Sequence, residues 1–140
     1  MYYNKMIMIK GISHITIIVK DIEKTAVLFQ KLFNAEEIYS SGNDIHSISK
    51  EKFLLINDIW LAIMEGESLL EKTYNHIAFH VSSHDFDAYS KKINELGLEI
   101  RKDRNRISGE GKSIYFYDYD NHLFELHTGL LDERLKNYKK

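Results

Sequence analysis

The 140-residue sequence contains no cysteine and no proline. Without cysteine the chain cannot form disulfide bonds, use a thiolate nucleophile or build a cysteine-based zinc site. The sequence also lacks an apolar run that approaches the roughly 20 residues of a membrane span. Residues 1–10 contain neither the apolar core nor the cleavage site of a signal peptide. We therefore expect a cytoplasmic protein in which these residues are a short leader to the first strand.

Neither positively nor negatively charged residues are in large excess. The formal net charge is −2, and 29% of the residues are charged. Such a balance predicts no strong field that would draw the chain to nucleic acid or to a membrane. The 44% hydrophobic content is that of a globular protein. We expect a single domain over residues 1–140, built either as one unit or as two small repeated units that share a core.

The first half of the chain begins with a β-branched segment over residues 11–20, which predicts a strand. Asp21 then suits the N-cap of a helix over 22–33, where apolar residues recur at helical spacing. The following short strands are expected over 37–40, 45–49 and 59–64, and Glu51-Lys52 is expected to interrupt the chain before the apolar segment 53–56.

The second half repeats this order. A strand is predicted over 74–81, a cap at Ser83, and a helix over 86–96 that ends at Gly97. Short strands follow over 98–101, 113–117 and 123–127, and a final helix covers about 131–138, with a basic end that reaches 139.

The two halves also match residue by residue. The shift that places His14 on His76 places Val19 on Val81 without a gap. We interpret residues of about 9–66 and 73–128 as two copies of a βαβββ unit. The prediction is an α+β fold in which two curled sheets form a barrel-like core.

Glu125 lies in the middle of an apolar strand, between Phe124 and Leu126, and a buried carboxylate there needs a partner. His14 and His76 occupy equivalent positions on the first strand of each copy. If the concave faces of the two copies meet, two imidazoles and one carboxylate converge. That set suits a divalent transition metal with open coordination positions. The remaining strand and turn histidines are expected to be ordinary core or edge residues: His80, His84, His122 and His127.

The repeat raises the question of a fourth metal ligand. The same shift places Glu125 on Ile63, which cannot bind a metal. A slip of two residues would put Glu65 there instead. This position separates a three-ligand site from a four-ligand site.

Several segments carry a resemblance to a known family. They are Asn-Ala-Glu-Glu-Ile-Tyr-Ser-Ser-Gly at 34–42, Ser-Lys-Glu-Lys-Phe at 49–53, Ile-Met-Glu-Gly at 63–66, Thr-Tyr-Asn-His-Ile-Ala-Phe at 73–79, and 109–127, which opens with Gly-Glu-Gly. At these residues the chain resembles the vicinal oxygen chelate superfamily and, within it, the hydrolytic fosfomycin resistance proteins. The resemblance covers about residues 11–138.

The resemblance implies a concrete chemistry. In that family Mn²⁺, held by two His and one Glu, binds the epoxide oxygen and the phosphonate of fosfomycin, and a nearby glutamate activates water to give a diol. By position the metal ligands would be His14, His76 and Glu125, and the base would be Glu51. The family forms a homodimer in which each site takes His14 from one subunit and the other two ligands from its partner.

This chemistry agrees with the residues that are present. A Lewis acid stabilises the alkoxide that develops as the epoxide opens, and a carboxylate must take a proton from water. The same ligand set also serves other divalent cations, such as Fe²⁺ in oxygenases. Cations for the phosphonate are offered by the basic segment 101–106 and by Lys112. Within the basic segment our choice is Arg106, and Ser113 and Tyr115 share a strand face from which their hydroxyls could donate to the phosphonate. The further substrate contacts implied by the resemblance are Thr16, Trp60, Tyr74 and Arg134.

Three alternatives stay open from the sequence. A thiol transferase would open the same epoxide with glutathione or another cellular thiol, and it would not need Glu51 as a base. A lyase or isomerase of the glyoxalase kind would need a fourth ligand such as Glu65. A non-catalytic protein that sequesters a drug would share the fold and need no metal.

Overall fold

The computed structural model describes residues 8–139, so most of the expected leader lies outside the described part. No described helix is long and apolar enough to cross a membrane. The elements are β1 (Ile15–Val19), α1 (Ile22–Phe33), β2 (Glu36–Ser40), β3 (Glu51–Ile56), β4 (Ile59–Glu65), β5 (His76–His80), α2 (Ser83–Glu95), β6 (Ile100–Arg101), β7 (Ser113–Tyr117), β8 (Leu123–His127) and α3 (Leu131–Tyr138).

The strands form two four-stranded sheets with the same topology. The strand orders are β1-β4-β3-β2 and β5-β8-β7-β6. In each sheet the first strand pairs in parallel with the last strand of its unit, and the remaining pairs are antiparallel. The predicted α+β fold of two βαβββ units is therefore confirmed. The two described sheets share no hydrogen-bonded strand pair, so one chain does not close a barrel by itself.

Helix α1 joins the two units into one core. It begins after Asp21, whose side chain accepts a hydrogen bond from the amide of Lys24, and it ends at Asn34 in the left-handed conformation. Besides covering its own sheet, α1 packs against the second one: Phe29 and Phe124 of β8 have ring centroids 5.7 Å apart. Both of these rings are fully buried. The helix-covered faces of the two sheets therefore meet in a single core.

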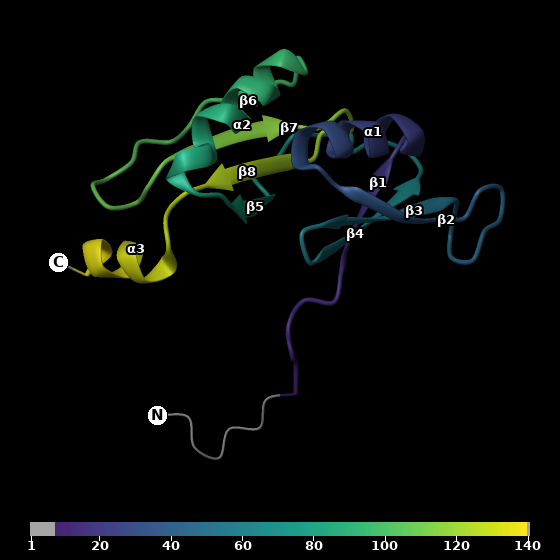
Figure 1. Cartoon of the computed structure of the whole chain (residues 1–140), viewed down its shortest axis with the longest axis horizontal. Helices are drawn as coiled ribbons and strands as arrows, with labels where there is room; N and C mark the ends of the chain where they lie inside the picture. Colours follow the sequence, from purple (N-terminus) through teal and green to yellow (C-terminus); the bar gives the residue numbers. More distant parts are fainter. Residues whose placement is uncertain (1–7, 140) are drawn as a thin grey trace.

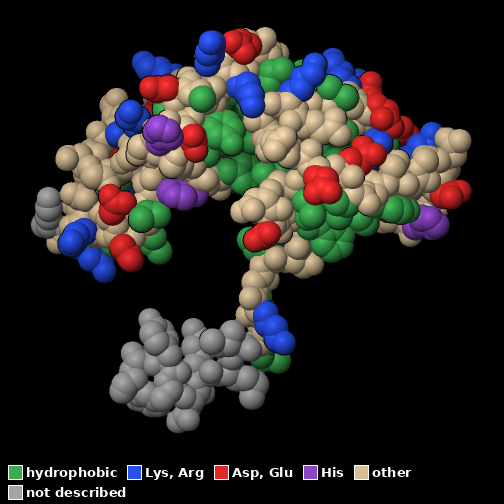
Figure 2. Space-filling model, in the orientation of Figure 1, with side chains coloured by type: hydrophobic (Ala, Val, Ile, Leu, Met, Phe, Trp, Pro, Cys, Tyr) green, Lys and Arg blue, Asp and Glu red, His purple; other side chains and the backbone are tan. Residues whose placement is uncertain are grey.

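The shared core leaves the opposite face of each sheet uncovered. In Figure 1, α1 and α2 lie above the two sheets, and the lower side carries no helix over the strands. Figure 2 shows that this lower side is hollowed. Because both uncovered faces point away from the same core, they lie side by side and do not face each other. The condition that the concave faces meet is therefore not fulfilled within one described chain, and the dimer that the resemblance implies stays a prediction.

Two predictions about the first sheet are also wrong. Residues 45–49 form an exposed bend and no strand; Ile48 is 78% exposed. Glu51 and Lys52 do not interrupt the chain but begin β3, and both are buried. Burial by itself would lower the pKa of Lys52, but hydrogen bonds with Glu37 and Glu23 outweigh it and raise the pKa. The charge of Lys52 is thus paired and can be buried.

The second unit needs smaller corrections. Helix α2 begins three residues earlier than predicted, and its cap is Ser82 in place of Ser83: the Ser82 hydroxyl accepts a hydrogen bond of 3.2 Å from the amide of Asp85. Strand β5 is shorter than predicted, whereas β7 and β8 have the predicted bounds.

Replacing Phe29 by alanine tests the shared core. We expect Phe29→Ala to reduce the free energy of unfolding by about 3–5 kcal/mol, because a fully buried ring leaves a cavity between α1 and both sheets. Urea unfolding followed by far-ultraviolet circular dichroism and tyrosine fluorescence should show one transition. Ile48→Ala, on the exposed bend, is the matched control and should change stability by less than about 0.5 kcal/mol. Separate transitions for the two halves would contradict a common core.

Candidate metal centre and active site

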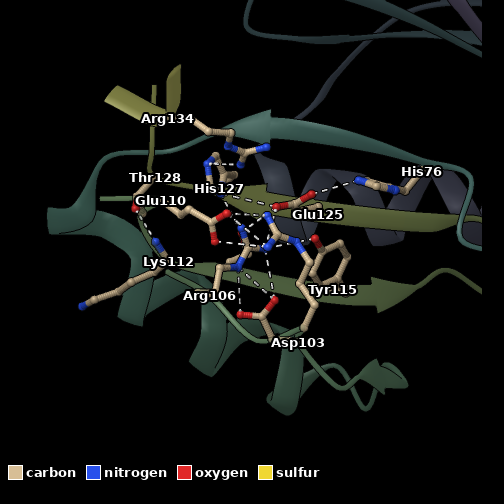
Figure 3. Close-up of polar contacts among 12 residues, drawn as sticks. His76, Asp103, Arg106, Glu110, Lys112, Tyr115, Glu125, His127, Thr128 and Arg134 are labelled. Atoms are coloured by element: carbon tan, nitrogen blue, oxygen red, sulfur yellow. Dashed lines mark hydrogen bonds and ion pairs between the residues drawn. The ribbon is translucent and has the colours of Figure 1, made fainter. Parts of the chain in front are cut away.

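Glu125 is the centre of a polar network on the uncovered face of the second sheet (Figure 3). It is only 5% exposed, and it pairs with Ala78 of β5 on one side and Tyr115 of β7 on the other. Its Oε1 lies 2.9 Å from Nε2 of His76. Its Oε2 accepts hydrogen bonds from the Ser113 hydroxyl at 2.5 Å and from Nη2 of Arg106 at 3.4 Å. The buried carboxylate therefore has the partners that its burial requires.

The hydrogen bonding of His76 makes this pair suitable for a cation. A carbonyl oxygen only accepts, so Nδ1 of His76 carries a proton and donates it to the Tyr74 carbonyl at 2.7 Å. In the neutral ring, Nε2 then presents a lone pair to the Glu125 oxygen. Two lone pairs at this distance repel each other unless a proton or a metal ion lies between them. A backbone carbonyl on the far nitrogen is also the usual support for a metal-binding histidine, so these residues fit a divalent metal.

His127 supports Glu125 from the other side. A guanidinium only donates, so Nε2 of His127 accepts from Nη2 of Arg134 at 3.1 Å. Nδ1 of His127 then donates to the Ser113 hydroxyl at 2.6 Å, and that hydroxyl donates to Glu125. Burial lowers the pKa of His127, and Arg134 lowers it further, while Glu125 opposes the change. The low pKa favours the neutral ring that this chain of hydrogen bonds needs.

Arg106 brings positive charge to the same face. It forms an ion pair of 3.1 Å with Asp103 and donates to the Tyr115 hydroxyl at 3.0 Å. Its Nη1 is buried and has no hydrogen-bond partner among the described residues. Burial raises the pKa of Tyr115, and its hydrogen bond with Tyr74 adds to the effect, so the hydroxyl stays neutral. Nη1 of Arg106 is thus a hydrogen-bond donor that no described residue accepts from.

Two cavities lie beside His76. One has a volume of about 290 Å³, and its lining includes His76, Glu125, His127 and Arg134. The other has a volume of about 660 Å³ and lies against the connection between β4 and β5. The lining of the larger cavity contains Glu71 but no Arg or Lys, so it is poorly suited to an anion. The smaller cavity combines the candidate ligand pair with a cation.

The other predicted site residues lie on the uncovered face of the first sheet. His14 is exposed, and its ring centroid lies 4.3 Å from that of Trp60. The strand register places Thr16 and Glu51 on this same face. Glu51 is only 7% exposed, yet its carboxylate makes no hydrogen bond or ion pair with the described residues. Trp60 Nε1 is also buried without a partner in the described part of the chain.

The structure therefore divides the predicted site into two groups. Within residues 8–139 no three His, Asp or Glu side chains are positioned to share a metal ion. The second sheet, with the loop and helix beside it, brings together His76, Glu125, Tyr74, Arg106, Ser113, Tyr115 and Arg134. The first sheet carries His14, Thr16, Glu51 and Trp60.

The strand register also decides the fourth-ligand question. Glu125 pairs with Ala78, and the equivalent pair in the first sheet is Ala62 with Thr16. Ala62 therefore occupies the position expected for Ile63. Ile63 points to the opposite face and is fully buried in the core, and Glu65 has the same parity as Ile63. Alanine has no ligand atom, so the equivalent position in the first copy adds no fourth ligand.

Comparison with known proteins shows the family of the chain. The family model described as "Glyoxalase/Bleomycin resistance protein/Dioxygenase superfamily" matches residues 11–126. The chain belongs to this superfamily. Among curated members, it is 61% identical over 133 residues to the fosfomycin resistance protein FosX of Listeria innocua, covering 95% of this chain and 100% of that protein. It is 34% identical to the metallothiol transferase FosB of Bacillus licheniformis, covering 94% of this chain and 83% of that protein.

Solved structures of superfamily members are similar as well. A mutant of FosX from Listeria monocytogenes, complexed with Mn(II) and 1S,2S-dihydroxypropylphosphonic acid, superposes with a TM-score of 0.86 at 59% identity. The match covers 94% of this chain and 99% of that one. FosX from Mesorhizobium loti superposes with a TM-score of 0.82 at 52% identity, over 92% of this chain and 99% of that one.

Sequence reasoning did not find the part played by His127. It was expected to be an ordinary core or edge residue, but it contacts both Ser113 and Arg134. The available signal was strand alternation, because His127 lies two residues beyond Glu125 and so shares its face.

Removing the Ser113 hydroxyl tests whether it orients Glu125. We expect Ser113→Ala to weaken divalent-cation binding about tenfold, because outer partners of a ligand typically contribute 10–100-fold to metal affinity. Titration with Mn²⁺, followed by electron paramagnetic resonance without substrate, measures this directly. Ser47→Ala, on the exposed bend, is the control and should bind as the unmodified protein does. An unchanged affinity in Ser113→Ala would show that Glu125 does not depend on this hydroxyl.

Proposed function

We propose that this protein confers fosfomycin resistance by adding water to the epoxide of fosfomycin, which gives a diol. The observation that carries the proposal is the facing pair of His76 and Glu125, 2.9 Å apart, in a chain that is 61% identical to FosX. The diol in the related FosX complex, 1S,2S-dihydroxypropylphosphonic acid, differs from an epoxypropylphosphonate by one added water. The balanced charge and the absence of cysteine suit a cytoplasmic enzyme that acts on a small molecule.

Mn²⁺ is the proposed cofactor, and its proposed ligands are His14, His76 and Glu125. When bound, such an ion supplies Lewis-acid polarisation of the epoxide oxygen. The chain's own residues must then deliver the nucleophile. Glu51 is proposed as the base: the residue is 7% exposed on an uncovered face, and its carboxylate has no hydrogen-bond or ion-pair partner among the described residues, so it is available to accept a proton from water.

The phosphonate needs cations and neutral donors around it. Arg106 suits this role because its Nη1 is buried without a partner among residues 8–139, and a guanidinium pairs well with a tripodal oxyanion. Arg134 offers a second guanidinium beside the smaller cavity. The hydroxyls of Ser113, Tyr115 and Tyr74 can reorient toward an anion. Thr16 and Trp60, on the other sheet, are proposed to complete the substrate contacts.

The two groups of residues are proposed to meet across a homodimer. One described chain holds only two of the three metal ligands together. An isologous two-fold arrangement would set the first sheet of each subunit against the second sheet of its partner. Each site would then combine His14 and Glu51 of one subunit with His76 and Glu125 of the other. The uncovered faces described above suit this arrangement (Figure 1).

The alternative is that a thiol opens the same epoxide. The FosB relatives are named metallothiol transferases, which implies thiol transfer for those proteins. The higher identity to FosX favours hydration. Glu51, whose carboxylate has no partner in the described part of the chain, favours hydration too, because a thiolate nucleophile needs no base at that position.

Phosphorus NMR of fosfomycin incubated with the enzyme and Mn²⁺ distinguishes the two reactions. We expect the diol to form without any thiol, and we expect Glu51→Gln to lower kcat by about 10²–10⁴-fold while Mn²⁺ binding is retained, because an amide cannot accept the proton. Glu65→Gln, at the exposed end of β4, is the matched control. Turnover that requires glutathione or another thiol would establish transfer instead, and full hydration by Glu51→Gln would remove Glu51 from the mechanism.

Mixing two inactive variants tests the shared site. His14→Ala and Glu125→Gln should each be inactive alone. When the two are unfolded and refolded together, heterodimers should contain one intact site, so about a quarter of the unmodified activity should return. If each site is formed within a single subunit, the mixture stays inactive. Refolding each variant by itself controls for losses in the procedure.

A further inference from the structure

Within the described chain, helix α3 (Leu131–Tyr138) is not held in place by apolar packing. None of its residues is buried, and its N-cap, Leu130, makes no side-chain capping bond. In Figure 1 it projects beyond the second sheet, away from α1 and α2. Yet this helix carries Arg134, which donates to His127 beside the candidate metal pair. Polar contacts must therefore hold it against the sheet.

The main polar contact is made by Glu110 in the loop between β6 and β7. Its carboxylate accepts a hydrogen bond from the hydroxyl of Tyr138 in α3. It also pairs with Nη1 of Arg104 at 3.1 Å and accepts from the amide of Ile107 at 3.1 Å. Glu110 is only 2% exposed, although no residue of the proposed reaction contacts it in the described chain. Burying a carboxylate is unfavourable unless the group is paired, so its three partners indicate that Glu110 has a structural role here.

The glycines on either side of Glu110 bring the loop close to α3 and to the segment that leads into it. Gly109 and Gly111 both have positive φ, at 86° and 83°. A Cβ at Gly111 would lie 2.6 Å from the amide nitrogen of Gly129, and a Cβ at Gly109 would collide with the side chain of Asn137. Only glycine allows both the backbone conformation and this approach. The Gly-Glu-Gly sequence at 109–111 is thereby explained as a docking segment for α3.

The loop between β6 and β7 and helix α3, which Glu110 joins, are also the two elements that bring guanidinium groups toward Glu125. The loop carries Arg106, which donates to Glu125 and to Tyr115. The helix carries Arg134, which reaches Glu125 through His127 and Ser113. Neither arginine lies on a strand, so the sheet does not fix either of them. Their separation depends on how the loop and the helix are held together (Figure 3).

We propose that Glu110, Arg104 and Tyr138 form a latch that positions Arg106 and Arg134 as a pair for the phosphonate. The three are positioning residues, because they act through the two arginines and do not touch the substrate. This inference rests on the proposed function for its substrate, but the latch itself is a property of the fold. Removing it frees the loop and the helix together and reduces anion affinity, while the metal ligands stay on the rigid sheet.

The charge state of the latch is stable. The hydrogen bond from Tyr138 lowers the pKa of Glu110 to about 2, and the amide of Ile107 and the charge of Arg104 lower it too, against the effect of burial. Near neutral pH the carboxylate is therefore ionised, and the latch remains closed.

Tyr138→Phe removes the hydroxyl and leaves the ring. We expect KM for fosfomycin to rise about fivefold to tenfold, with kcat changed by less than about twofold. Mn²⁺ affinity, measured without substrate, should fall less than it does in Ser113→Ala, because Ser113, His76 and Glu125 all lie on strands. Deuterium uptake should rise in residues 102–112 and in 131–138 together, and not in β7 or β8. Tyr119→Phe, on an exposed turn, is the matched control and should alter none of these values.

A second variant separates a latch from a general loss of stability. Glu110→Gln removes the charge that holds Arg104, and it should raise KM more than Tyr138→Phe does while the loop and helix again exchange together. Faster exchange in only one of the two segments, or joint exchange with an unchanged KM, would overturn the proposal. If the unmodified enzyme does not convert fosfomycin, the proposed function fails by itself; affinity for inorganic phosphate in the presence of Mn²⁺ then replaces KM, and a latch variant that binds phosphate normally would overturn the latch.

Discussion

The burial of one carboxylate determines the arrangement of the second sheet. Glu125 is 5% exposed in a strand whose neighbours Phe124 and Leu126 are fully buried. An ionised group at that depth is tolerated only with partners, and the structure supplies an imidazole, a hydroxyl and a guanidinium. The hydroxyl of Ser113 and the guanidinium of Arg106 both donate to the same carboxylate oxygen, Oε2. Among the described residues, the other oxygen lies beside Nε2 of His76, at 2.9 Å, which is the pair proposed to bind a cation.

The two copies of the βαβββ unit have the same topology but different chemistry. At the position of Glu125 the first copy has Ala62, and at the position of Ser113 it has Glu51. One face therefore carries the residues proposed to hold a cation and an anion, and the other carries His14 and Glu51, whose carboxylate has no partner among the described residues. Neither face is complete alone, which agrees with the proposal that they function together across a dimer.

Helix α1 is the reason that a single chain does not join these faces. It shares a buried core with Leu54, Leu61 and Ile63 of the first sheet, and it contacts the second sheet through Phe29 with Phe124 and Phe33 with Phe79. One core is then shared, and the uncovered faces lie next to each other on the same side (Figure 1). The cost of ordering α3 and the loop at 102–112 is offset by polar contacts and not by apolar burial. Such elements are the parts of a fold that can respond to a ligand.

The sequence by itself determined the elements with strong local patterns: α1 after its cap, both strands around Glu125, the repeat, and Glu125 and His76 as metal-ligand candidates. It failed where the outcome depended on distant partners. Lys52 could begin a buried strand only because Glu23 and Glu37 pair with it. The tertiary structure alone decided the pairing of β1 with β4, which put alanine opposite Thr16. Hydrogen-bond register is set between strands far apart in the chain, and a shift of one residue turns every side chain to the other face.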